Sequence, residues 1–116
     1  MTNPISKHNP LSHYKWGDNC DGWNLIGKPE IGIKQELMPA YTAEKLHYHS
    51  RAEQFFFILK GKATFLIEGE KTMLNANEGL CIQAGDKHKI MNDTADNLEF
   101  ILCSYPSTQN DRTDCE

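Results

Sequence analysis

The chain has 116 residues and a formal net charge of −4, and 39% of its residues are hydrophobic. This length fits one domain, which can bury roughly two thirds of its unfolded surface in a single core. Acidic and basic residues are interspersed, so there is no basic stripe for nucleic acid and no polybasic patch for a membrane. The first residues, MTNPISKHNPLSHYKWG, are polar where a signal peptide needs an apolar run. We therefore expect a cytoplasmic protein that binds neither nucleic acid nor membrane.

The first 30 residues show no regular pattern, although several aromatic and aliphatic side chains give this segment something to pack with. We interpret residues 1–30 as an amino-terminal arm that packs on the rest of the domain. Trp16 and Trp23 flank residues 19–22, whose composition predicts a turn.

From Ile31 onward, short apolar runs alternate with turn-forming residues, and no period of 3.6 residues is sustained. This pattern predicts strands at residues 31–38, 45–49, 54–60, 62–69, 70–76, 80–84, 88–93 and 97–105. Gly69 supplies the positive φ that a tight hairpin requires. So many short strands indicate an all-β sandwich or closed barrel over residues 31–105. Residues 106–116 form a polar tail that we expect to fray.

Two histidines one residue apart stand out within this pattern. On a strand, His47 and His49 point to the same face, while Tyr48 points away. Two imidazoles in an apolar segment are costly unless their nitrogens are satisfied, and one transition metal ion satisfies both. A solvated pair of histidines is the alternative. His88 follows a turn two hairpins later, far enough along the chain to lie across a small barrel.

These spacings resemble the two sequence motifs of the cupin family. The first motif is matched by His47, His49, Gln54 and Gly61, and the second by Gly85, His88 and Asn92. The string WGDNCDGWNLIG also resembles a signature of small bacterial single-domain cupins of the cupin 2 type. The resemblance implies a double-stranded β-helix, a jelly-roll barrel with one metal site in its open end. The chain departs from the motifs at Tyr41, Asn77 and Gln83, and at Gln54, where the family usually has a glutamate.

The register of residues 53–60 decides the fourth ligand. Gln54 shares a strand face with Phe56 and Ile58, whereas Glu53 shares the other face with Phe55. The six-residue gap before the motif glycine selects Gln54, and Glu53 stays open as the alternative. Gln54 then either binds the metal or hydrogen-bonds a histidine and orients its ring.

The resemblance implies a metal-dependent enzyme, dioxygenase-like or isomerase-like, that acts on a small oxygenated organic substrate. Its metal would be Fe, Mn, Ni or Zn, bound by His47, His49, His88 and Gln54. Two alternatives remain: a non-catalytic module that uses the metal to bind or sense a small molecule, and a metal-free barrel. Tyr41 and Glu53 are candidate general acids or bases. Because residues 54–60 are apolar on both strand faces, we also expect a homodimer.

Overall fold

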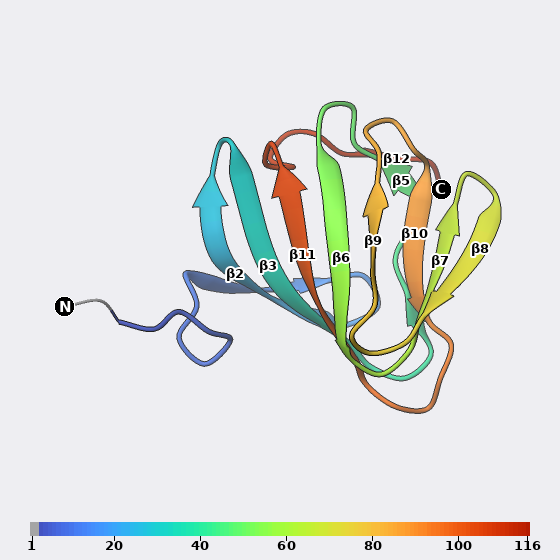
Figure 1. Cartoon of the computed structure of the whole chain (residues 1–116), viewed down its shortest axis with the longest axis horizontal. Coiled ribbons are helices and arrows are strands. Elements are labelled where there is room, and N and C mark those ends of the chain that lie inside the picture. The colour runs from blue at the N-terminus through green and yellow to red at the C-terminus, as the bar shows by residue number, and fades with distance from the viewer. Residues whose placement is uncertain (1–2) are drawn as a thin grey trace.

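The chain folds into two antiparallel sheets that face each other (Figure 1). A computed structural model describes residues 3–116, and within that range it contains twelve strands and no helix. The first sheet has the order β1 (Ser12–Trp16), β2 (Cys20–Lys28), β3 (Ile31–Met38), β11 (Leu98–Tyr105), β6 (Glu53–Lys60) and β9 (Gly79–Ile82). The second has the order β12 (Thr113–Asp114), β5 (His47–Tyr48), β10 (His88–Asn92), β7 (Ala63–Ile67) and β8 (Glu70–Leu74), and β4 (Thr42–Ala43) pairs with β10. This arrangement is the jelly-roll, or double-stranded β-helix, that the sequence predicts.

Every strand predicted from residue 31 onward is present, and β3 has the predicted bounds. Nearer the amino terminus, the sequence did not predict the strands within residues 12–28, and it placed the turn between them wrongly. Residues 12–28 form the β1–β2 hairpin, which pairs with β3 and extends the first sheet. The turn lies at residues 17–19 rather than 19–22, because Gly17 and Asn19 take positive φ of 49° and 59° and β2 begins at Cys20.

The expectation that the tail frays is also wrong. Within the tail, β12 pairs with β5, and the amide of Cys115 donates to the carbonyl oxygen of Leu46 at 2.8 Å. The Asp111 side chain is buried. These contacts join the last residues of the chain to the stretch that contains His47 and His49.

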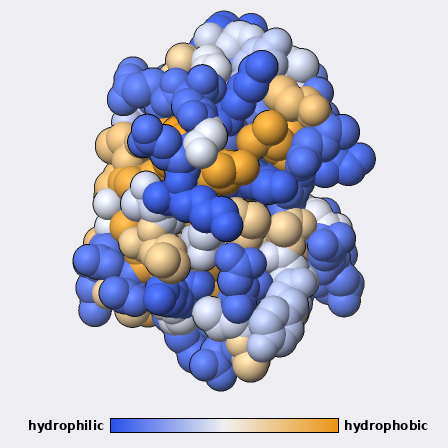
Figure 2. All heavy atoms as spheres, turned by 90° about the vertical axis from the view of Figure 1, so that its right-hand side faces the viewer, coloured by the Kyte–Doolittle hydropathy of each residue, from blue (hydrophilic) through white to orange (hydrophobic). Residues whose placement is uncertain are grey.

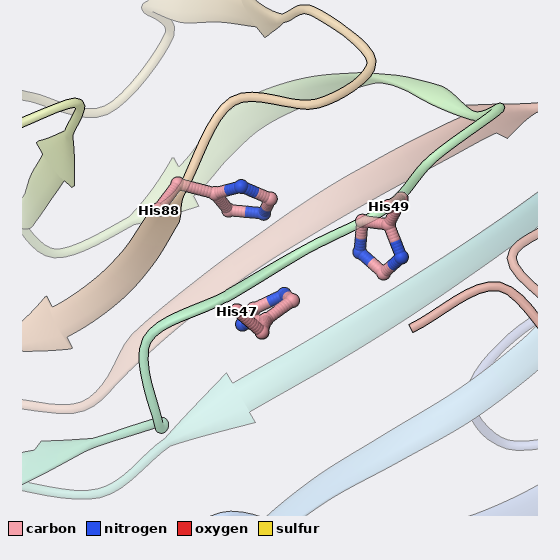
Figure 3. A group of neighbouring side chains, drawn as sticks. All are labelled: His47, His49 and His88. Carbon is pink, nitrogen blue, oxygen red and sulfur yellow. The ribbon is translucent and has the colours of Figure 1, made fainter. Parts of the chain in front are cut away.

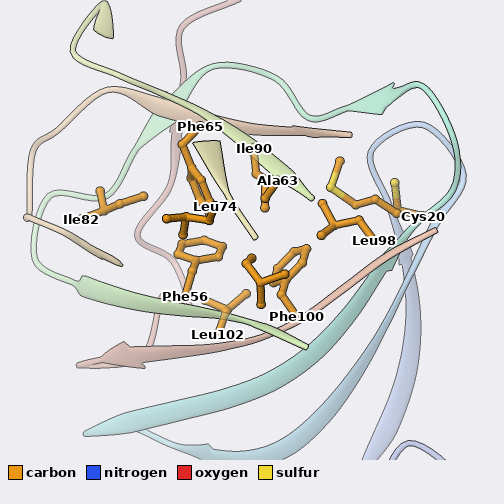
Figure 4. Close-up of a cluster of buried hydrophobic side chains, with 12 residues drawn as sticks. Cys20, Phe56, Ala63, Phe65, Leu74, Ile82, Ile90, Leu98, Phe100 and Leu102 are labelled. Carbon is orange, nitrogen blue, oxygen red and sulfur yellow. The ribbon is translucent and has the colours of Figure 1, made fainter. Parts of the chain in front are cut away.

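The core lies between the sheets, where alternate residues of each strand point inward (Figure 4). Phe56 of β6 packs against Phe65 of β7 and Phe100 of β11, with ring centroids 5.2 and 5.5 Å apart. Burying a side chain of this size stabilises the fold by roughly 1.5–3 kcal/mol. The same alternation directs Ile58 into the core and leaves Phe55 partly exposed on the outer face.

Asn92, the last residue of the second motif, is fully buried, and its side chain holds the backbone around it. Its Nδ2 lies 3.0, 3.1 and 2.8 Å from the carbonyl oxygens of Met38, Pro39 and Asp96. Its Oδ1 accepts hydrogen bonds from Thr94. One side chain thereby joins the end of β3 to the loop before β11.

Gly61, the last residue of the first motif, is required by close packing. Its φ is +87°, and a Cβ there would lie 2.5 Å from the carbonyl oxygen of Asn97. Any side chain would therefore displace backbone.

The molecular surface beside β7 and β8 is mainly hydrophilic, and hydrophobic residues form only small groups on it (Figure 2). Four of the five residues of β8 are exposed. Among residues 3–116 there is no helix long and apolar enough to cross a membrane.

Candidate metal centre

The three histidines singled out by their spacing lie together inside the barrel (Figure 3). His47 begins β5, His49 follows directly after it, and His88 begins β10 opposite His47 in the antiparallel ladder. The ring centroid of His47 lies 5.0 Å from that of His49 and 4.4 Å from that of His88. One ring nitrogen from each histidine falls within 4.8 Å of the other two.

Backbone carbonyl groups set the tautomer of all three imidazoles. The Nδ1 atoms of His47 and His88 lie 2.8 Å from the carbonyl oxygens of Lys45 and Asp86, and Nδ1 of His49 bonds to the carbonyl oxygen of Asp111. A carbonyl oxygen can only accept, so each Nδ1 carries the proton. Each Nε2 of a neutral ring is therefore left with a free lone pair, the form in which histidine binds a metal.

Burial keeps these rings neutral. It lowers the pKa of His47 to about 3 and also lowers the pKa of His49 and of His88, against the opposing effect of their backbone hydrogen bonds. Protons therefore do not compete for the Nε2 lone pairs near neutral pH.

The buried acceptors of this site lack donors. Nε2 of His88 and Oε1 of Gln54 are buried without a hydrogen-bond partner among residues 3–116. Leaving such an atom unsatisfied costs roughly 1–3 kcal/mol. A cation would satisfy both, and a set of imidazole nitrogens with one amide oxygen suits a divalent transition metal. The residues present thus fit the metal that the spacings imply.

Gln54 lies on the inner face of β6, and Glu53 lies on the outer face, half-buried. The Gln54 Nε2 donates to Oγ of Ser104 at 3.1 Å, which leaves its Oε1 for the site. The rings are oriented by backbone carbonyls rather than by this amide. The geometry thus offers Gln54 as a ligand, a role that stays a prediction.

A cavity of about 180 Å³ adjoins the cluster and is lined in part by His47, His49 and Gln54. Its wall also contains Tyr14, Glu36, Glu44 and Arg112, none of which the sequence singled out. The two candidate acids or bases that were singled out lie elsewhere. Tyr41 is 71% exposed, and neither it nor Glu53 lines the cavity.

Glu36 is a buried carboxyl group in this wall. It projects from β3 and accepts a hydrogen bond from the Tyr14 hydroxyl at 2.5 Å. Burial raises the pKa of Glu36 to about 7, even though the Tyr14 hydrogen bond and the Lys34 charge act in the opposite direction. Burial and the neighbouring Glu36 likewise raise the pKa of Tyr14 above its ordinary value. Of the two groups, Glu36 is therefore the one that gains or loses a proton near neutral pH.

Glu44 is the second buried carboxyl group. Its Oε1 lies 3.8 Å from Nδ1 of His47 and 3.7 Å from Nη1 of Arg112, and its Oε2 accepts the Ile90 amide at 3.1 Å. Burial, together with the charge of Glu36, raises the pKa of Glu44 to about 8. Arg112 opposes this shift and ties the tail to the cavity wall.

The family model of the cupin domain matches residues 34–105. The chain belongs to the cupin family. An uncharacterized protein of Methanocaldococcus jannaschii is 29% identical over 87 residues, which cover 72% of this chain and 70% of that protein.

Two solved cupin structures show how far the fold is shared. An RmlC-like cupin from Shewanella frigidimarina superposes with a TM-score of 0.81 at 13% identity, covering 95% of this chain and 96% of that one. A predicted oxalate decarboxylase from Thermotoga maritima gives a TM-score of 0.71 at 20% identity, covering 76% and 81%. At these identities the likeness shows the fold alone.

Among the cavity residues of this cupin that the sequence did not single out, Glu36 could have been recognised from its strand pattern. Glu36 alternates with Met38 on one face of the predicted strand 31–38, so a carboxyl group shares the inward face with a core residue. Tyr14 and Arg112 come from segments without a strand pattern, and nothing local placed them in the site.

The raised pKa of Glu36 predicts how the stability of the metal-free cupin depends on pH. The folded state holds the Glu36 proton up to about pH 7, whereas the unfolded chain releases it near the ordinary value of 4.5. The free energy of unfolding that Glu36 contributes should therefore fall as pH rises from 4.5 to 7, by about 3 kcal/mol. Glu36→Gln should remove this part of the dependence and leave the part that the raised pKa of Glu44 contributes, as measured by urea unfolding with a chelator present.

Glu30→Gln is the matched control, because Glu30 is exposed. It should keep the wild-type dependence on pH. Equal slopes for wild type and Glu36→Gln would show that the carboxyl group of Glu36 titrates normally.

Proposed function

We propose that this cupin is a metal-dependent enzyme that acts on a small oxygenated organic substrate. The observation that carries the proposal is a cluster of three free imidazole nitrogens beside a cavity whose wall holds buried carboxyl groups. His47, His49 and His88 are the proposed ligands, with Gln54 as the fourth, and Fe, Mn, Ni or Zn is the proposed metal. Such an ion supplies Lewis acidity and, when it is iron, redox chemistry.

Glu36 is the residue we propose for proton transfer. A general acid or base works best when its pKa lies near the working pH, and burial brings Glu36 to about 7. The Tyr14 hydroxyl donates to Oε2 of Glu36 and holds the carboxyl group in one orientation. The proton is then held in a water-poor part of the cavity wall.

The cavity limits the size of the substrate. Its volume of about 180 Å³ lies below the roughly 300–1,000 Å³ typical of sites for drug-sized ligands. The ionisable lining, with Lys34 and Arg112 beside the carboxyl groups, suits a molecule with several oxygen atoms. The fold shared with a predicted oxalate decarboxylase agrees with a small oxygenated substrate without naming it.

The alternative, a module that binds or senses a small molecule without converting it, is favoured by the rest of the lining. Trp16, Phe56 and Leu102 give the same cavity an apolar side. An apolar wall contributes affinity but takes no part in proton transfer. We place the enzyme first because a binder gains nothing from carboxyl groups buried at a cost in stability.

We also propose that the outer face of β6 joins two copies of the chain in a homodimer. Phe55 and Leu59 are 37% and 38% exposed on this face, and Phe57 lies half-buried between them. The rings of Phe55 and Phe57 are stacked, with centroids 6.3 Å apart. Contiguous aromatic surface of this kind is typical of subunit interfaces.

Three further expectations stay predictions: the division into residues 1–30, 31–105 and 106–116, the cytoplasmic location, and the lack of nucleic-acid and membrane partners. The interspersed charges of the sequence support the last of these.

Metal content and turnover test the proposed function together. Protein purified without added metal should contain a transition metal, and His88→Ala should lose most of it, as measured by elemental analysis. The protein loaded with each metal should convert a compound from a panel of enediols, catechols, thiols and keto-sugars. Glu36→Gln should keep the metal and lose roughly 10²-fold or more in turnover.

Full metal content in His88→Ala would contradict the ligand assignment. Saturable binding of a panel compound with no product under any metal would instead support the sensing module.

The Gln54 assignment predicts a charge effect on metal affinity. Gln54→Glu adds a negative charge beside the proposed ion and should tighten binding about tenfold or more in a chelator competition. Glu53→Gln, on the outer face, should change the affinity less than about twofold. The reverse pattern would place Glu53 at the metal.

The dimer proposal predicts twice the chain mass by light scattering at micromolar concentration. Replacing Phe55 and Leu59 together by Lys should give a monomer, because it places charge in the apolar contact. Met73→Lys is the matched control, since Met73 is 62% exposed on β8, away from this face. A monomeric wild type would overturn the proposal.

A further inference from the structure

We propose that the carboxy-terminal segment 111–116 is a structural part of the metal centre and that Asp111 is the positioning residue for His49. This inference rests on the proposed metal function. It assigns a role to a segment that lies beyond the residues matched by the cupin domain model.

Asp111 holds His49 and the loop after it at the same time. Its carbonyl oxygen accepts the Nδ1 proton of His49. Its carboxylate accepts the amide of Ser50 at 2.7 Å through Oδ1, and the amides of Arg51 and Ala52, each at 3.0 Å, through Oδ2. The side chain is 5% exposed, so water competes little for these bonds. One buried residue therefore sets both the tautomer of His49 and the path of the backbone that carries it.

The rest of the segment holds the other end of the histidine stretch. The amide of Leu46 donates to the Glu116 carboxylate at 2.6 Å, and the carbonyl oxygen of Leu46 accepts the Cys115 amide at 2.8 Å. In the ladder between β12 and β5, Asp114 pairs with His47 and Thr113 pairs with Tyr48. Each residue from 46 to 52 is thus held by a residue from 111 to 116.

The opposite side of the histidine stretch has little support from the sheet. There β5 pairs with β10 at a single position, His47 with His88. Without the tail, His49 would lie in a loop that has lost the hydrogen bonds of its side chain and of the three amides that follow. We infer that two of the three proposed ligands depend on the tail for their position.

The tail is held by polar contacts rather than by apolar burial. Within residues 106–116, all of which the structure describes, Asp111 has the only buried side chain. Docking of the tail therefore contributes little hydrophobic free energy. A ligand that binds the docked state more tightly can shift the equilibrium between the docked and the undocked tail. If the tail raises metal affinity by a given factor, the metal stabilises the docked tail by the same factor.

The first test measures the affinity of Zn²⁺ for the full chain by chelator competition. Asp111→Ala should weaken binding by roughly 10- to 100-fold, the range found when a group that orients a metal ligand is lost. Asp93→Asn is the matched control: it removes the same charge at an exposed position outside the tail, directly after β10. It should change the affinity less than about twofold.

Cobalt absorption separates positioning of His49 from general loss of stability. At saturating Co²⁺, the visible spectrum of Asp111→Ala should differ from that of wild type, whereas the spectrum of Asp93→Asn should not. The spectrum of Asp111→Asn should lie between those of Asp111→Ala and wild type, because the asparagine amide keeps one acceptor oxygen. Identical saturated spectra and affinities for all three variants would overturn the role of Asp111.

The second test needs no substitution. Trypsin cuts after Arg112, within the tail, and cleavage there reports undocking. Saturating Zn²⁺ should slow cleavage of the bond between residues 112 and 113, followed by mass spectrometry, while cleavage after Lys71 on exposed β8 should keep its rate. Equal rates at residue 112 with and without bound Zn²⁺ would overturn the inference. Absence of any Zn²⁺ binding by wild type would instead overturn the proposed function.

Discussion

The site depends on three hydrogen bonds from imidazole Nδ1 atoms to backbone carbonyl oxygens. A carbonyl group cannot donate, so these bonds fix the tautomers without a charged partner and leave three Nε2 lone pairs directed into the protein. Burial then lowers the pKa of every ring and keeps those lone pairs free of protons. The two carbonyl groups nearest in sequence belong to residues two positions before their histidines, and the third comes from the far end of the chain.

The strand pattern of residues 31–105 was predictable because it is local. Alternation of inward and outward residues with period two located β3 and β6, placed Gln54 on the same face as Phe56, and put His47 beside His49. Paired motif spacings added His88. These features depend only on residues close together in the sequence, so they can be recognised in a single sequence without its tertiary contacts.

The remaining parts of the site were not predictable because the contacts that order them are long-range. The bonds from Asp111 join residues about sixty positions apart, and the tail that carries it has the composition of a disordered end. The β1–β2 hairpin likewise gains its order by pairing with β3, and so brings Tyr14 to Glu36. From composition alone such segments are predicted to be irregular polar ends, because the residues that order them lie far away in the sequence.

The glutamine at position 54 is consistent with the charges around it. The cavity wall already contains Glu36 and Glu44, whose pKa values burial raises to about 7 and about 8. A third carboxylate at position 54 of β6, which also lines this cavity, would repel both groups in their ionised forms and raise these values further. A neutral amide avoids that repulsion and offers an oxygen to the proposed metal without reducing its charge. With glutamine at position 54, the carboxyl groups of this region lie in the cavity wall rather than in the proposed ligand set, and Glu36 among them is the group that we propose for proton transfer.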